Sequence, residues 1–342
     1  MGVNKQYQVA VVGATGAVGQ QLLRLLEERL FPVAKLLPLA SPRSARTEIE
    51  FGGDKIKVQA LDHQSFKGID IALFSARSAI SAEYAPLAAQ AGAVVIDNTA
   101  CFRMDQDVPL VVPEVNVEDI RDYRKKNIIA NPNCSTIQVV VAVKPIADAV
   151  GIERMVVSTY QAVSGAGRQA MSELEAQVVA LFNHREVPIQ VLGRQLAFNC
   201  VPWIGKLQDS GESDEEAKMR NESRKMLHLP DLQVTCTCVR VPIFNGHSAA
   251  VNLQLKSELA PERAKALLRE AKGVLLVDDV PAGEIPTPLM ANEQDATLVG
   301  RIRRDSSVPH GLNLFCCADN LRKGAATNAV QIAEILVRDY LN

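Results

Sequence analysis

Cys134 is the residue whose type and position point most directly to chemistry. It lies in the run Asn131–Thr136, between an apolar strand predicted over 127–130 and an apolar helix predicted over 136–149. Polar residues and a proline before an apolar run indicate a helix N-terminus. The positive end of a helix dipole favours the thiolate of a cysteine, and backbone N–H groups at the same turn can stabilise an oxyanion. A small buried core residue is the alternative, so a catalytic role for Cys134 requires support from a second feature of the sequence.

A glycine-rich turn near the N-terminus supplies that observation. Gly13, Gly16 and Gly19 follow the apolar strand predicted over 7–12 and open the helix predicted over 17–29. Glycines let the chain turn tightly and approach a pyrophosphate, which then binds at the helix N-terminus. The spacing differs slightly from the usual dinucleotide fingerprint, and a plain strand–helix turn is the alternative. We predict a dinucleotide site at this turn, formed by Gly13, Thr15, Gly16, Ala17 and Val18.

The end of the second predicted strand, over 35–40, indicates which dinucleotide is bound. It lacks the acidic residue that contacts the ribose 2′-hydroxyl of NAD. Ser41, Arg43 and Ser44 follow instead, and they can hold a 2′-phosphate through charge-assisted hydrogen bonds. The pattern favours NADP as the cofactor, and an exposed basic loop is the alternative.

A nucleophilic thiolate together with a nicotinamide cofactor favours one reaction class. The thiolate adds to an aldehyde, the hemithioacetal releases a hydride, and phosphate or water opens the resulting thioester. A base must accept and return the protons, and His247, within Phe244–Ser248, is the best candidate of the five histidines. The residues therefore indicate an oxidoreductase that acts on a small aldehyde.

Composition limits the class of protein. A chain of 342 residues fits two domains, and aromatic residues at only 4% imply a core of Val, Leu, Ile and Ala. Lys and Arg number 37 against 39 Asp and Glu, so no basic excess suggests a nucleic-acid partner. No apolar run has the length of a membrane helix, and the N-terminus shows no signal-peptide pattern. We expect a cytoplasmic protein with a small-molecule substrate and no membrane partner.

The remaining cysteines predict neither a disulfide framework nor a metal site. A total of seven is odd, and no signal peptide accompanies it. Cys236, Cys238, Cys316 and Cys317 lack zinc-ligand spacing and lie in apolar, strand-like segments. We interpret these four as small core residues and expect no bound metal.

Periodicity predicts an α/β fold with two different halves. The first 130 residues alternate apolar strands with helical stretches, which indicates a doubly wound parallel sheet. From about residue 152 the strands are longer, which indicates an α+β domain with a largely antiparallel sheet. Strands are predicted over 69–75, 93–97, 155–160, 234–241 and 249–255, and helices over 82–91, 169–182, 261–270 and 324–340.

Over nearly its whole length the sequence resembles the aspartate-semialdehyde dehydrogenase family of lysine, methionine and threonine biosynthesis. The motifs are weak singly but specific in this order: Gly13–Gly19, Asp97–Arg103, Val112–Asn116, Asn131–Thr136, Tyr160–Gly167, Arg240–Pro242, Asn245–His247 and Asp319–Gly324. The resemblance implies NADPH-dependent, reversible reductive dephosphorylation of L-aspartyl 4-phosphate to L-aspartate 4-semialdehyde. It further implies a Rossmann-type fold for the nucleotide domain.

Specific residues acquire expected roles from this resemblance. Cys134 matches the nucleophile that carries the thioester, His247 the acid/base, and Gln161 a residue that positions the thioester. Arg240 matches the clamp for the substrate α-carboxylate, for which a planar bidentate guanidinium is apt. The positions that match cofactor-site residues are Ser164, Gly165 and Asn320.

The resemblance also assigns residues to the phosphate and the ammonium of the substrate. Arg103 and Lys218 match ligands of the phosphate, and Glu215 matches the partner of the substrate ammonium. Glu215 lies three residues before Lys218, so both face one side of a predicted helix. A solvated loop and helix face is the alternative for residues 208–218.

The resemblance also implies a homodimer and an interrupted domain order. Residues 1–132 and 321–342 are expected to form the NADP-binding domain, and residues 133–320 the catalytic and dimerisation domain. One departure concerns Arg77, in Ser75–Ser78, where the family usually has a glycine beside the cofactor. Arginine would crowd a close backbone approach there or contact the cofactor phosphates instead.

Two other functions remain open at this point. N-acetyl-γ-glutamyl-phosphate reductase uses the same thioester logic, but an acylated amine would not need Glu215. A non-catalytic paralogue that serves as a binding protein is the second alternative. Joint retention of Cys134, Gln161, Arg240 and His247 argues against it.

Overall fold

The computed structural model describes residues 5–341, and its chain divides into two compact units. Unit 1 combines the N-terminal residues up to Asn133 with the C-terminal segment from Ala325. Unit 2 runs from Cys134 to Gly324. Cys134 is therefore the first residue of unit 2.

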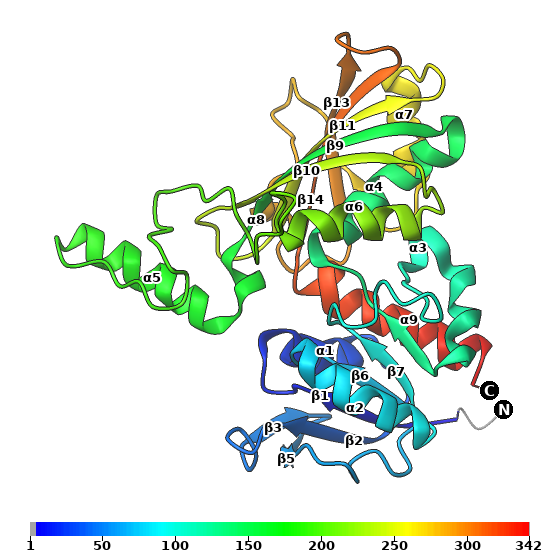
Figure 1. Ribbon diagram of the computed structural model, residues 1–342, viewed down its shortest axis with the longest axis vertical. Coiled ribbons are helices and arrows are strands. Elements are labelled where there is room, and N and C mark those ends of the chain that lie inside the picture. Colours follow the sequence, from blue (N-terminus) through cyan, green and yellow to red (C-terminus); the bar gives the residue numbers. More distant parts are fainter. Residues whose placement is uncertain (1–4, 342) are drawn as a thin grey trace. The chain divides into compact units, whose positions relative to one another are not determined.

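Unit 1 contains a six-stranded sheet in which every pairing is parallel, in the order β5-β2-β1-β6-β7-β8 (Figure 1). Its short inner strands β6 and β7 are buried along their whole length, which matches a sequence that is apolar except for Asp97 at the end of β7. The strands are β1 (Tyr7–Val12), β2 (Val33–Ala40), β5 (Gln59–Ala60), β6 (Ile71–Phe74), β7 (Val94–Asp97) and β8 (Ile128–Ala130). A hairpin that the periodicity does not predict, β3 (Glu48–Phe51) and β4 (Asp54–Lys57), follows β2.

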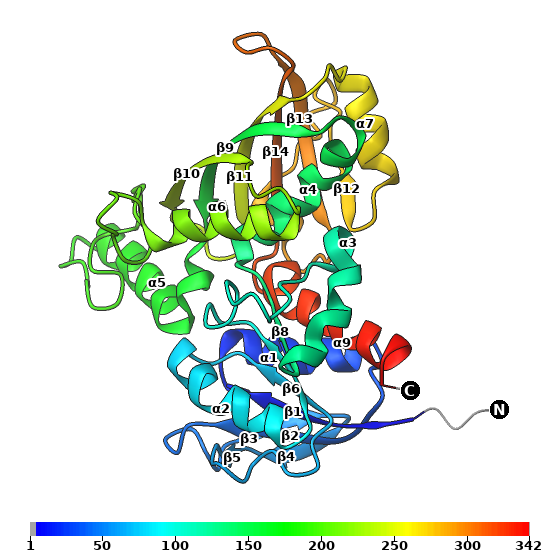
Figure 2. The ribbon, with the colours of Figure 1, turned by 45° about the vertical axis from the view of Figure 1, so that its right-hand side comes forward.

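Helices cover both faces of this sheet (Figure 2). They are α1 (Ala17–Glu28), α2 (Ser78–Gln90), α3 (Pro113–Asn116), the 3₁₀ segment η1 (Val117–Lys125) and α9 (Thr327–Asp339). Leu22 of α1 and Ile332 of α9 share one apolar core with Val9 and Ile96 of the sheet. The order in which successive strands are added reverses between β1 and β6, because β2 lies to one side of β1 and β7 to the other side of β6. Ligands of doubly wound sheets bind at such a switch point, and here it lies at the end of β1.

Unit 2 contains a second six-stranded sheet, in the order β10-β9-β11-β14-β13-β12. The three inner pairings are antiparallel and the two outer ones are parallel. The strands are β9 (Ile152–Gln161), β10 (Gln233–Arg240), β11 (His247–Leu255), β12 (Val274–Leu276), β13 (Thr297–Asp305) and β14 (Gly311–Ala318). The last three lie outside the segments predicted as strands. The expected fold class, a doubly wound parallel domain plus an α+β domain, is confirmed.

One face of the second sheet packs against three helices, α4 (Cys134–Val150), α6 (Asp214–Met226) and α7 (Pro261–Glu270). The short helix α8 (Pro288–Ala291) contacts β14. The 3₁₀ turn η2 (Val163–Ala166) and α5 (Arg168–Phe182) begin an arm with its own small core (Figure 1). A π-helical turn, η3 (Arg322–Ala326), precedes α9.

Membrane-spanning helices are absent from residues 5–341. None of the helices described there combines enough length with enough apolar character to cross a bilayer.

Candidate active site

Cys134 is the first residue of α4 and directly follows the polar run that ends β8. The helix begins two residues before the predicted start, which places the thiol in its first turn. The Cys134 side chain is half-buried, and Gly324 packs against it. Because helix N-termini carry a partial positive charge, this position favours a thiolate.

Three polar residues from different strands lie side by side at the end of the second sheet. Arg240 pairs with Gln161 across β10 and β9. The pairing of Ser248 with Tyr160 across β11 and β9 makes His247 the next cross-strand neighbour of Gln161. Directly paired residues point to the same face of a sheet. We call Arg240, Gln161 and His247 the polar row.

His247 is fully buried and held in one tautomer. Its Nδ1 accepts the Ala162 N–H at 3.0 Å, so Nε2 carries the hydrogen of the neutral ring. Nε2 has no hydrogen-bond partner among the described residues. Burial lowers the pKa of His247 to about 3, and the Arg240 cation acts in the same direction. The imidazole is therefore neutral at physiological pH and offers one N–H donor.

Arg240 is oriented by the same backbone unit. Its Nη1 donates to the Ala162 carbonyl at 2.6 Å, and a Cβ at Gly165 would lie 3.5 Å from that nitrogen and 3.2 Å from His247 Nε2. Burial lowers the pKa of Arg240, whereas Cys134 and Glu215 act in the opposite direction. The interaction with Cys134 places a cation where it stabilises a thiolate.

Glu215 joins the polar row to α6. Gln161 Nε2 donates to one Glu215 oxygen at 3.1 Å, and Lys218 Nζ lies 3.2 Å from the other. Ser213 and Glu216 form a reciprocal capping box at the start of α6, and Glu216 also accepts the Cys238 N–H at 3.0 Å. The helix start is thereby fixed to β10, and the charged stretch presents Glu215 to the site.

Ser164 and Asn320 form a second polar pair in unit 2. Asn320 Nδ2 donates to Ser164 Oγ at 2.9 Å, and Asn320 Oδ1 accepts the Gly246 N–H at 2.9 Å. Gly246 precedes His247, so this pair supports the loop that begins β11. The structure thus brings together Cys134, the polar row, Glu215, Lys218, Ser164, Gly165 and Asn320 in unit 2.

The glycine turn occupies the switch point of unit 1. Gly13 has φ of 86°, and a Cβ there would lie 2.8 Å from the Ser75 carbonyl oxygen, so both backbone conformation and space require glycine. Gly16 is the N-cap of α1, and no side chain caps that helix. The N–H groups of Ala17 and Val18 therefore begin a helix suited to a phosphate. The Gly13 N–H donates to the Leu39 carbonyl at 2.8 Å, which places the end of β2 beside this turn.

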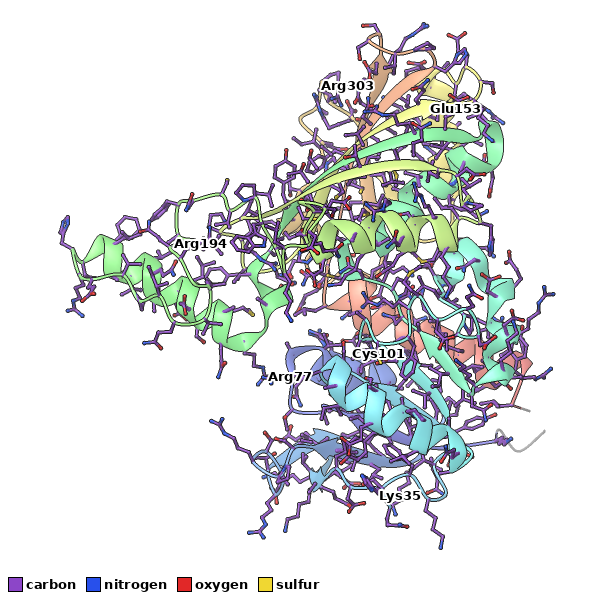
Figure 3. All side chains as sticks on the ribbon, viewed as in Figure 1. Lys35, Arg77, Cys101, Glu153, Arg194 and Arg303 are labelled. Carbon is purple, nitrogen blue, oxygen red and sulfur yellow. The ribbon has the colours of Figure 1, made fainter. Side chains whose placement is uncertain are left out.

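Ser41, Arg43 and Ser44 follow β2 at that edge of the sheet. Ser41 and Arg43 are exposed, and the Ser44 N–H donates to the Ser41 carbonyl at 2.9 Å. Arg77 is the N-cap of α2 with φ of −89° and an exposed side chain (Figure 3). Its backbone therefore needs no glycine.

Arg103 lies in unit 1, separate in the chain division from the other substrate residues. Its Nε donates to the Asn131 carbonyl at 3.0 Å and its Nη2 to the Asn98 carbonyl at 2.8 Å. Asn328 Nδ2 donates to Asn131 Oδ1 at 2.7 Å, which ties the end of β8 to α9. These bonds orient a buried guanidinium.

The strand cysteines differ from Cys134 in their surroundings. Burial raises the pKa of Cys316, and that of Cys317 to about 12. Hydrogen bonding and burial raise the pKa of Cys236, whose Sγ lies 3.5 Å from that of Cys238. The thiols of Cys236, Cys316 and Cys317 stay protonated and are poor nucleophiles.

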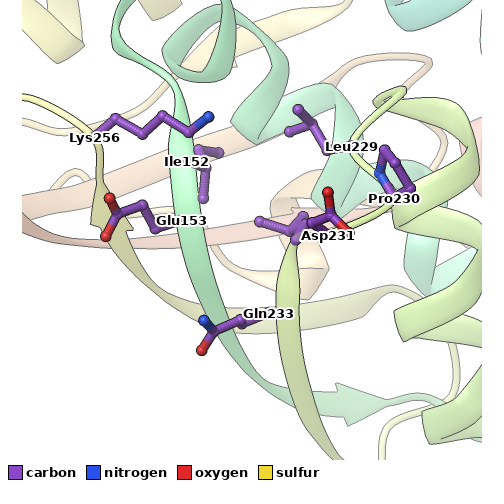
Figure 4. A pocket seen from close by; sticks show the side chains of 8 residues that line it. Ile152, Glu153, Leu229, Pro230, Asp231, Gln233 and Lys256 are labelled. Carbon is purple, nitrogen blue, oxygen red and sulfur yellow. The ribbon is translucent and has the colours of Figure 1, made fainter.

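A separate cavity of about 460 Å³ opens at the other end of β9 and β10 (Figure 4). Ile152, Glu153, Gln233 and Lys256 line it. The polar row lies at the far ends of both strands, roughly 25 Å away at ~3.3 Å per residue. This cavity is not part of the candidate site.

Two features of the site were not predicted from the sequence. Ala162 orients His247 and Arg240 through its backbone, for which no side-chain pattern exists. The capping box at Ser213 does have a signal, because serine followed three residues later by glutamate is its usual pattern.

The comparisons with known proteins agree over the whole chain. Residues 8–123 match the model of the semialdehyde dehydrogenase NAD binding domain, and residues 143–323 that of the semialdehyde dehydrogenase dimerisation domain. The aspartate-semialdehyde dehydrogenase of Aquifex aeolicus is 52% identical, with 98% of this chain and 99% of the relative covered. That of Legionella pneumophila is 53% identical, with 99% and 98% covered.

Solved structures give the same result. The crystal structure of aspartate semialdehyde dehydrogenase II complexed with ASA from Vibrio cholerae has a TM-score of 0.95 and 49% identity. It covers 98% of this chain and 99% of its own. The chain described here belongs to the aspartate-semialdehyde dehydrogenase family.

Proposed function

We propose that this chain catalyses the NADPH-dependent, reversible conversion of L-aspartyl 4-phosphate to L-aspartate 4-semialdehyde and phosphate through a thioester on Cys134. The observation that carries the proposal is the convergence of a helix-start thiol, Arg240, Gln161, a neutral His247 and Glu215 in unit 2. The product serves the biosynthesis of lysine, methionine and threonine.

Cys134 begins the reaction as the nucleophile. Its thiolate attacks the acyl carbon of the acyl phosphate, a C–S bond forms, the C–O bond to phosphate breaks, and phosphate leaves with the electron pair. NADPH, when bound, supplies the hydride that reduces the thioester. The thiolate then leaves as the aldehyde forms, and Arg240 stabilises its negative charge.

His247 is the proposed acid/base, and in the described state it acts first as a donor. The free Nε2–H is suited to hydrogen-bond the oxyanion that develops on the substrate carbonyl oxygen. Gln161 positions the thioester, and its bond to Glu215 fixes the amide. The neutral ring avoids a second cation next to Arg240.

The substrate's charged groups each have a proposed partner. Arg240 binds the α-carboxylate, Glu215 the ammonium, and Arg103 with Lys218 the phosphate. The hydrogen bond from Lys218 to Glu215 orients both side chains on one side of α6. A free ammonium explains why a buried acid belongs in the site, which favours the aspartyl substrate over an N-acetylated one.

The cofactor is proposed to be NADP, bound by residues 1–132 and 321–342, with residues 133–320 as the catalytic and dimerisation domain. The uncapped start of α1 fits a pyrophosphate, and Ser41, Arg43 and Ser44 fit a 2′-phosphate. Gly13, Thr15, Gly16, Ala17 and Val18 form the turn, and Ser164, Gly165 and Asn320 contribute from unit 2.

The decisive experiment is phosphate-dependent reduction of NADP and of NAD by the parent and by Cys134→Ser. We expect turnover of L-aspartate 4-semialdehyde with NADP by the parent and a near-complete loss in the variant. Arg43→Ala should weaken NADPH binding far more than NADH binding. Turnover of N-acetyl-glutamate semialdehyde alone would assign the other reductase activity. An inactive parent would indicate a binding protein, and an active Cys134→Ser would exclude the thioester.

A further inference from the structure

A cavity of about 280 Å³ lies beside Arg240, on the side of the arm that begins with η2 and α5. It is lined by Ala166, Val191, Leu192, Arg194, Leu196, Val201, Trp203, Ile204, Gly205 and Arg240. Two guanidinium-bearing residues and no acidic residue are in this set. We call it the arm cavity.

Arg194 is held at the arm cavity by an aromatic ring. Its guanidinium carbon lies 5.2 Å from the centre of the Trp203 ring, within the range of a cation–π contact. Arg194 comes from the loop that runs beside α5 (Figure 3). Its side chain forms no ion pair with an acidic residue in the described part of the chain.

The lining of the arm cavity carries the two positive charges of Arg194 and Arg240, and Glu215 acts on Arg240 from outside that lining. Asp214, which lies against the lining residue Gly205, accepts the Lys206 N–H at 2.9 Å and lies 3.4 Å from Lys218 Nζ. Arg240 is bound to a backbone carbonyl and has no ion pair within the described residues. Like charges that line one cavity repel each other unless an anion lies between or beside them.

We infer that Arg194, held over Trp203, is a second cation for the carboxylate of the incoming substrate and sets its KM together with Arg240. The inference rests on the proposed function, because an anionic amino-acid substrate is what brings a carboxylate to Arg240. Arg194 binds the anion on its way through the arm cavity and takes no part in bond making or breaking. Arg194 increases the rate at which the substrate is captured, because electrostatic attraction accelerates association.

The test compares Arg194→Gln with Arg185→Gln, a matched loss of one exposed charge on the same arm but outside the cavity lining. Arg194→Gln should raise the KM for L-aspartate 4-semialdehyde about two- to fivefold and leave kcat within about twofold. Raising salt to ~0.5 M should increase the KM of the parent more than that of Arg194→Gln. Arg185→Gln should match the parent in both constants.

A binding readout independent of turnover comes from Trp203, the one tryptophan of the chain. Titration with L-aspartate 4-semialdehyde in the absence of cofactor should change Trp203 fluorescence in the parent. The midpoint should move about two- to fivefold higher in Arg194→Gln. An unchanged midpoint, equal KM values for the two arginine variants, or an altered oligomeric mass of Arg194→Gln would overturn the inference. A parent without activity on this aldehyde would instead refute the proposed function itself.

Discussion

His247 shows how burial and one backbone hydrogen bond define what a residue can do. The ring is fully buried and Nδ1 is occupied by the Ala162 N–H, so a second proton would have to displace that bond beside Arg240. The neutral ring is thus a consequence of its surroundings rather than of pH. Cys316 and Cys317 illustrate the same effect, since burial is the main cause that raises the pKa of both thiols.

The low pKa of His247 has a consequence for stability. The unfolded chain takes up a proton near the ordinary histidine pKa of about 6.5, whereas the native ring does so only near about 3. Between these values the unfolded state binds more protons, so the free energy of unfolding falls as pH decreases. The slope from this residue is about 1.4 kcal/mol per pH unit.

His247→Gln removes this contribution and keeps an amide that can accept the Ala162 N–H. The difference in unfolding free energy between parent and variant should therefore shrink from near pH 7 to near pH 5, by about 2 kcal/mol. Urea denaturation at the two pH values measures it, and a difference independent of pH would contradict the neutral ring. The same variant should lower kcat by about 10²–10⁴ if His247 is the acid/base.

At the scale of elements, α6 matters because its first turn carries Glu215 and a residue one turn later is Lys218. Ser213 caps the helix and Glu216 completes the box, while Glu216 also binds the β10 backbone. The helix start is thereby connected to the strand that ends in Arg240. Loss of the cap should loosen the acid that holds Gln161.

Ser213→Ala tests this connection. It should destabilise the protein by about 0.5–2 kcal/mol, as loss of an N-cap usually does. The KM for the semialdehyde should rise with it, because Glu215 is less well held. Ser210→Ala, in the exposed loop before the cap, is the matched control and should change neither quantity. An unchanged melting temperature in Ser213→Ala would show that the cap is dispensable.

Local signals explain which parts were predictable from sequence. The start of α4 at Cys134 and the turn at Gly13 follow from capping patterns and glycine spacing, which act over a few neighbouring residues. The polar row does not, because Gln161, Arg240 and His247 meet only through the register of β9, β10 and β11. Strand β14 escaped prediction because it is buried almost throughout and lacks simple alternation. Strand β13 is likewise buried over its first four residues and does not alternate there.

At the scale of the whole molecule, the open face of the second sheet requires an explanation. Tyr160 on this face is 40% exposed, and its ring lies 6.2 Å from that of Phe315, measured between centroids. Val156, Ala250, Arg301 and Arg303 line a cavity of about 250 Å³ there, and Arg303 is labelled in Figure 3. The match of residues 143–323 to a dimerisation domain points to a second copy of this chain as the partner. We propose a homodimer through this face.

Ala250→Arg is the variant that tests the proposed interface. Ala250 pairs with Ser158 and Phe315 near the middle of the face, so an arginine there meets its own copy and the nearby Arg301 and Arg303. Like charges across an interface cost several kcal/mol, enough to separate the copies. Sedimentation should give twice 37.1 kDa for the parent and 37.1 kDa for the variant.

Gln90→Arg on exposed α2 adds the same charge elsewhere and should remain dimeric. A dimeric Ala250→Arg with native circular dichroism would place the interface on another surface, and a monomeric parent would refute the homodimer.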